Sequence, residues 1–155
     1  MIRRLSLALL AGAALAGPVR AQLADTKVLS SEGAKVALAA AEAEARKNGW
    51  ALSIAVVDAH GELLAFTRMD GASLLSIGIS QGKARTSART KRATKEYADR
   101  ITGGNNATLA LDVMPLEGGV PIVVNGVVVG AIGASGATSP QDAQASMAGA
   151  AAVKP

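Results

Sequence analysis

Few side chains in this 155-residue sequence are suited to chemistry. It contains no cysteine and a single histidine, His60. The absence of thiols excludes cysteine nucleophiles, disulfide scaffolds, zinc knuckles and cysteine-ligated iron–sulfur clusters. One histidine also rules out a histidine-rich metal cage within one subunit. The sequence has neither a glycine-flanked serine elbow nor a Walker loop, so no common nucleophile or phosphate motif is present.

Lys83 and Thr86 form the first candidate binding pair. They lie three residues apart, which places them on one face of a helix. A lysine surrounded by alanine and glycine can meet a ligand carboxylate or, when partly buried, have a lowered pKa. Its stem can equally lie along a sheet with the ammonium in water. The sequence leaves both interpretations open.

A glycine-rich turn provides the second candidate. Gly118 and Gly119 precede Pro121, and successive backbone N–H groups in such a turn can face an anion. Two glycines before a strand can also serve only to let the backbone turn. The pattern does not distinguish an anion site from a simple turn.

His60 is the weak candidate for a metal ligand. A neutral imidazole is the ordinary axial ligand of haem iron. However, His60 lies between Ala59 and Gly61 in a predicted hairpin turn, where a polar residue is expected in any case. We therefore favour the turn interpretation.

The end of the same hairpin carries Arg68, Met69 and Asp70. Asp70 and the earlier Asp58 can each pair with Arg68 or accept turn N–H groups. Met69 is the best placed of the methionines to offer a thioether to a ligand, although methionine more often fills gaps in a core.

The elements that must position these residues follow from hydrophobic patterns and turn signals. The predicted order is a helix at 32–47, a hairpin of 50–57 and 62–68, two helices or one broken helix within 73–100, a strand at 109–113, a hairpin of 122–124 and 127–132, and a helix from 139. Gly78 and Gly82, four residues apart, are expected to let the second helical region pack closely on the sheet. This order predicts one α/β (α+β) domain with an antiparallel sheet flanked by helices.

The first 21 residues predict a secretory signal peptide. Arg3 and Arg4 precede a short apolar stretch at 5–16, and small residues allow cleavage after Ala21. The apolar stretch is too short to span a bilayer stably. We therefore expect a single periplasmic or secreted domain at 22–155, with no membrane contact after cleavage.

The charge balance makes nucleic acid an unlikely partner. The whole chain has 16 basic and 12 acidic side chains, and three of the arginines lie within the predicted signal, so the rest is nearly balanced. A basic cluster at 83–100 is either a solvated helix face or a docking place for carboxylates or an acidic surface. Alanine supplies much of the hydrophobic half, so we expect homo-oligomer formation to add burial.

The sequence resembles the GlcG/HbpS family of haem-binding proteins in segments that occur in the family's order. They are VDAHGELL and RMDGA at 57–72, KARTSA at 83–88, GGVPI at 118–122, GAIGASG at 130–136 and QD at 141–142. The resemblance implies a profilin-like fold, assembled into homo-oligomers. Members are described as haem-binding or haem-degrading, and related domains accompany corrinoid adenosyltransferases or glycolate metabolism. Lys83 matches the family's recurring lysine, whereas the resemblance gives His60 no ligand role.

Residues and resemblance together predict an exported protein that binds a small molecule, either haem or a related carboxylated ligand. The scarcity of aromatic side chains counts against a strong intrinsic affinity for haem. One alternative is a small enzyme in which Lys83, with a depressed pKa, transfers a proton on an oxo- or hydroxy-acid. Another is a non-catalytic accessory subunit of an exported enzyme. The predicted ligand-binding residues are Arg68, Met69, Asp70, Lys83, Thr86, Gly118, Gly119 and Pro121.

Overall fold

The computed structural model describes residues 26–155, so the predicted signal peptide at 1–21 lies outside the described residues. The elements in chain order are α1 (Ser31–Lys47), β1 (Ser53–Asp58), β2 (Leu63–Arg68), α2 (Leu75–Thr90), α3 (Lys95–Thr102), the 3-10 helix η1 (Asn106–Ala110), β3 (Gly119–Val124), β4 (Val127–Ser135) and α4 (Ser139–Ala152). The predicted architecture, an antiparallel sheet flanked by helices, is confirmed. None of the helices in this part of the chain combines the length and apolar character needed to cross a bilayer.

The sheet has four strands in the order β2-β1-β4-β3, and each neighbouring pair is antiparallel. The two predicted hairpins are therefore joined side by side through β1 and β4. In this register Ser53 of β1 lies opposite Ser135 of β4. Pro121 is accommodated because β3 is an edge strand, where a missing N–H need not break a ladder.

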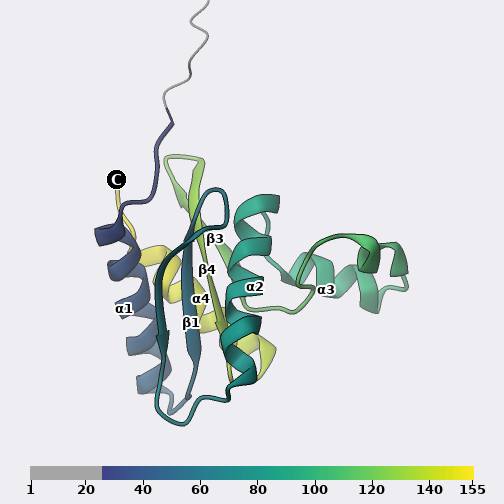
Figure 1. The fold of residues 1–155 in the computed structure, drawn as a ribbon, viewed down its shortest axis with the longest axis horizontal. Helices are drawn as coiled ribbons and strands as arrows, with labels where there is room; N and C mark the ends of the chain where they lie inside the picture. The colour runs from purple at the N-terminus through teal and green to yellow at the C-terminus, as the bar shows by residue number, and fades with distance from the viewer. Residues whose placement is uncertain (1–25) are drawn as a thin grey trace, which may run out of the picture.

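Helices cover both faces of the sheet, and β1 alternates between them. Ile54 and Val56 pack in the core that contains the alanines of α1 and Ala145 of α4. Ala55 and Val57 pack instead with Ala84 and Ala88 of α2. Figure 1 shows the resulting three layers, with α1 and α4 on one side of the sheet and α2 on the other.

The close approach of α2 to the sheet depends on a glycine of the sheet. A Cβ added at Gly133 of β4 would lie 2.5 Å from the backbone nitrogen of Ala84, so no side chain fits there. In contrast, a Cβ added at Gly78 would have no other atom within 4 Å, and one at Gly82 would face Met114. The expectation that Gly78 and Gly82 face the sheet is therefore wrong: they lie on the opposite side of α2.

The segment between α2 and β3 projects from the three layers. Figure 1 shows α3 and η1 extending beside the sheet. The predicted strand at 109–113 is wrong, because the end of η1 and an irregular bend occupy these positions. Asn105 and Asn106 favour local turns, and Leu109 and Leu111 remain exposed without a neighbouring strand to pair with.

Candidate functional site

Lys83 is buried within the protein, with 2% of its side chain exposed. Its Nζ donates hydrogen bonds to Oδ2 of Asp142 at 2.8 Å and to the carbonyl oxygen of Ala134 at 3.0 Å. The ion pair thus connects α2 to the first turn of α4. Burial raises the pKa of the Asp142 carboxyl above its ordinary value, and the hydrogen bond from Lys83 opposes this effect.

The two glycines of the predicted turn cover this ion pair. A Cβ at Gly118, whose φ is +132°, would lie 2.7 Å from Nζ of Lys83, and one at Gly119 would lie 2.8 Å from the Lys83 carbonyl carbon. The Gly118 carbonyl accepts a hydrogen bond from Ser146, and the Gly119 N–H donates one to Thr94. The glycines therefore allow close packing over Lys83, and these polar groups have partners inside the protein.

Thr86 lies one turn further along α2 and is also buried. Its Oγ1 accepts a hydrogen bond of 2.7 Å from the backbone nitrogen of Met114. This bond holds the irregular segment 112–114 against the outer side of α2.

A cleft of about 360 Å³ lies between α2 and this segment. We call it the α2 cleft. The residues that line it are Gly78, Gln81, Gly82, Arg85, Thr86, Asp112, Val113 and Met114.

The α2 cleft combines a flat helical surface with a cation. Gly78 leaves part of the helix open, so a planar molecule can approach the backbone closely there, whereas the Met114 side chain packs on Gly82. Among residues 26–155, Arg85 makes no hydrogen bond or ion pair, whereas Arg89 contacts the His60 carbonyl and Asp112. A free guanidinium is suited to a carboxylate, which it can bind through two parallel N–H groups.

Two further cations of the basic cluster are paired with acidic residues of α3. Arg92 pairs with Glu96 at 2.6 Å, and Lys95 pairs with Asp99 at 2.7 Å. These pairs are exposed and one helical turn apart, which supports the interpretation of α3 as a solvated helix face.

The remaining predicted site residues lie elsewhere. Arg68 and Asp70 are exposed at the end of β2, which is the edge strand opposite β3. Met69 packs in the core on the α1 and α4 side of the sheet. Pro121 is half-buried in β3 opposite Ala131. The structure therefore brings Lys83, Thr86, Gly118 and Gly119 together but separates them from the Arg68–Asp70 segment.

His60 occupies the exposed tip of the β1–β2 hairpin. Its backbone N–H donates to Oδ1 of Asp58 at 2.8 Å, as expected of a turn residue. It does not line the α2 cleft. Within residues 26–155, no three histidine or acidic side chains converge in a way that could hold a metal ion.

Sequence reasoning misses three contributions to this region. Asp142 is recognisable as the start of a helix but not as the partner of Lys83, 59 positions away. Arg85 lies in the KARTSA segment, where a cation close to Gly82 is a signal that could have identified it. Met114 gives no signal that it is attached to α2, since the bond to Thr86 forms through its backbone.

Fold and cleft together define a small α/β domain with a ligand-sized cleft on one helix. The family described as "Haem degrading protein HbpS-like" matches residues 29–151, and this chain belongs to that family. It is 46% identical over 109 residues to Protein GlcG of Escherichia coli (strain K12), covering 70% of this chain and 81% of GlcG.

Solved structures agree with this assignment. A double mutant of HbpS from Streptomyces reticuli has a TM-score of 0.76 and 34% identity, and the match covers 89% of this chain and 97% of HbpS. The structure of a PduOC:haem complex has a TM-score of 0.74 and 28% identity, covering 81% of this chain and 95% of PduOC. The family is thus one in which haem binding occurs.

Proposed function

We propose that this protein binds haem, or a related planar carboxylated ligand, in the α2 cleft. The observation that carries the proposal is the free Arg85 guanidinium in a cleft that also contains the open helix surface at Gly78. The acidic residue in the cleft, Asp112, lies 3.7 Å from Arg89 and so does not neutralise Arg85. The family description and the haem complex of PduOC support haem as the ligand.

The residues of the cleft fit such a ligand. Arg85 would bind a propionate, Gly78 would allow the ring to lie close to α2, and Val113 would shield it from water. Met114 is the soft donor among the lining residues, and a methionine thioether is an established axial ligand of haem iron. When bound, haem would supply redox chemistry at its iron, while the protein binds and orients it.

The geometry offers less to the two alternative functions. An enzyme using Lys83 for proton transfer needs its ammonium to reach a substrate, but the side chain is 2% exposed and paired with Asp142. For an accessory subunit docking through its basic cluster, two of the cations, Arg92 and Lys95, are already paired with acidic residues of α3, which leaves fewer free cations for a partner. Ligand binding therefore remains our proposal.

Export to the periplasm or the outside of the cell is part of the proposal and is supported by the signal-like pattern at 1–21. Fractionation of the producing cells, with N-terminal sequencing of the recovered protein, tests it. We expect a chain that begins at Gln22 outside the cytoplasm. A cytoplasmic protein that retains its first residues would contradict export and leave the haem proposal intact.

The proposed ligand is tested by titrating the protein with hemin and following the Soret absorbance. We expect saturable binding that becomes about three- to ten-fold weaker in Arg85→Gln, because a charged hydrogen bond to carboxylate is lost. Arg68→Gln is the matched control, since Arg68 is also exposed and belongs to the other group of predicted site residues. The absence of saturable binding would overturn the haem proposal, and weakening by Arg68→Gln alone would move the site to the end of β2.

A further inference from the structure

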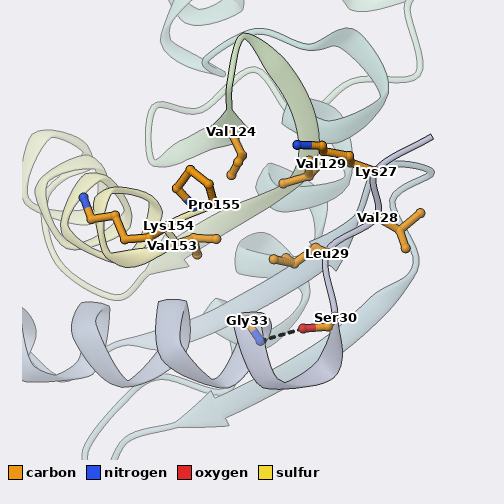
Figure 2. Close-up of a pocket in the computed structure, with 10 residues that line it drawn as sticks. All are labelled: Lys27, Val28, Leu29, Ser30, Gly33, Val124, Val129, Val153, Lys154 and Pro155. Carbon is orange, nitrogen blue, oxygen red and sulfur yellow. Dashed lines mark hydrogen bonds between the residues drawn. The ribbon is translucent and has the colours of Figure 1, made fainter. Parts of the chain in front are cut away.

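We propose a second binding site that takes an aliphatic monocarboxylate. It is a cavity of about 290 Å³ between the 27–30 segment, the β3–β4 hairpin and the residues that follow α4 (Figure 2). We call it the terminal cavity. It shares no lining residue with the α2 cleft, so the inference does not rest on the proposed haem site.

Aliphatic side chains form the interior of the terminal cavity. Leu29, Val124 and Val129 are nearly buried members of the main core, and each keeps a small exposed area of 4–8%. Figure 2 shows them facing Val153 and Pro155 across the cavity. Because these walls are apolar and contain no aromatic ring, they suit an alkyl chain.

The charged side chains that line the cavity are both basic, and the α-carboxylate of Pro155 is the acidic group among the lining residues. Lys27 and Lys154 are the charged side chains among its ten lining residues, and neither forms an ion pair within residues 26–155. In Figure 2 the ammonium of Lys27 lies beside Val129, whereas that of Lys154 is turned outward. Lys27 is therefore the better placed of the two to meet a carboxylate at the mouth of the cavity.

The N-terminus of α1 adds to this positive potential. The helix begins at Ser31, and the Ser30 hydroxyl already accepts a hydrogen bond of 3.1 Å from the N–H of Gly33. The helix dipole still favours a negative group near this end, although that effect by itself is small. An anionic head beside Lys27 with its aliphatic tail over Leu29 and Val129 satisfies both the charge and the apolar surface.

The size of the terminal cavity limits the length of the tail. At about 290 Å³ it lies at the lower end of the range for small-molecule sites, so it suits an alkyl chain of medium length. Affinity should therefore rise by roughly two- to four-fold per added methylene and then stop rising once the cavity is full.

Isothermal titration with butyrate, hexanoate, octanoate and decanoate, each below its micelle concentration, tests the proposal. We expect saturable binding of the longer acids, about two- to five-fold weaker binding in Lys27→Gln, and no change in Lys91→Gln. Lys91 is the matched control because it is exposed, unpaired among the described residues and outside the cavity. Val153→Phe, which places a ring in the cavity, should abolish binding while circular dichroism shows the fold unchanged.

Two further comparisons make the outcome decisive. Decylammonium, which has an alkyl tail of the same length and the opposite charge, should bind at least roughly five-fold more weakly than decanoate. Saturating the protein with hemin should leave the affinity for decanoate unchanged, because the two proposed sites are separate. Failure of every acid to bind saturably would overturn the proposal. So would equal weakening by Lys27→Gln and Lys91→Gln, because that would indicate nonspecific attraction to surface lysines.

Discussion

At the scale of single residues, burial decides what Lys83 does. Its ammonium and the Asp142 carboxylate are 2% and 3% exposed and lie 2.8 Å apart. Removing two charges from water is costly, and the loss is offset only while both partners are present. The same lysine on an exposed helix face would be free to bind a ligand.

The first stability prediction concerns this pair. Asp142→Asn leaves the Lys83 ammonium buried without a counter-charge, so we expect the free energy of unfolding to fall by about 3 kcal/mol. The double variant Lys83→Met/Asp142→Asn should lose less than the sum of the Lys83→Met and Asp142→Asn losses, because it removes both charges. Urea unfolding measures all of these values, and additive losses would show that the two residues are not coupled.

At the scale of elements, the two sides of α2 have different roles: one packs on the sheet, and the other lines the α2 cleft. Its inner side packs on β4 through Ser80 and Ala84, where Gly133 supplies the space. Its outer side carries Gly78 and Gly82, which line the α2 cleft. The helix is therefore held on the sheet by its inner side, while its outer side contacts Met114 and remains open to a ligand at Gly78.

A matched pair of glycine substitutions tests this difference. A Cβ added at Gly78 would have no neighbouring atom within 4 Å. Gly78→Ala should therefore stabilise the protein by about 0.5–1 kcal/mol, because alanine favours the helix more than glycine does. Gly133→Ala places a Cβ against the backbone of α2 and should destabilise it by about 3 kcal/mol. Thermal unfolding compares the two, and similar effects from both would contradict the packing described for α2.

Asp58 in the β1–β2 turn is expected to make the stability of the protein depend on pH. Partial burial opposes the charge on Asp58, but the backbone N–H groups of Glu62 and His60 hold the pKa of its carboxyl below its ordinary value. An acid with a lowered folded pKa stabilises the protein above its unfolded pKa of about 3.9 and loses this contribution as pH falls through the folded pKa.

Asp58→Asn should therefore be less stable than the original protein at neutral pH, and the difference should shrink below about pH 4. The asparagine oxygen can still accept both N–H groups, so the variant isolates the effect of the charge. Urea unfolding at several pH values gives the difference directly. A difference that does not depend on pH would assign the effect to geometry alone.

At the scale of the whole molecule, the core is built from small side chains. The buried residues of α1 are Ala34, Ala37, Ala41 and Ala45, and those of α4 include Ala145 and Gly149. Such helices approach closely but bury little apolar area each. Leu74 and Leu75 at the start of α2 are meanwhile more than 70% exposed. Both features support the expectation of a homo-oligomer that the composition raised.

The oligomer is tested by light scattering and by the dependence of Tm on concentration. We expect a mass that is a multiple of the single chain and a Tm that rises with protein concentration, because association stabilises the folded state. A single-chain mass with a Tm that stays constant over a wide range of concentration would contradict it.

Local signals account for most of the elements. The serine cap and the Asn48-Gly49 stop locate α1, and Asn125-Gly126 between valine-rich strands locates the β3–β4 hairpin. The strand predicted at 109–113 is wrong because a short apolar run does not specify whether a neighbouring strand is available to pair with it. In the candidate site, Lys83 and Thr86 lie on the same helix as predicted, but their partners were not predictable from local sequence.

The sequence by itself determined the order of helices and hairpins, the family and the absence of thiol chemistry, because each depends on residue types and near neighbours. The tertiary structure alone decided that Lys83 faces Asp142 and that Arg85 remains free in the α2 cleft. The physical reason is that burial and ion pairing join groups distant in sequence. Their partners are set by how α2, α4 and the sheet pack together.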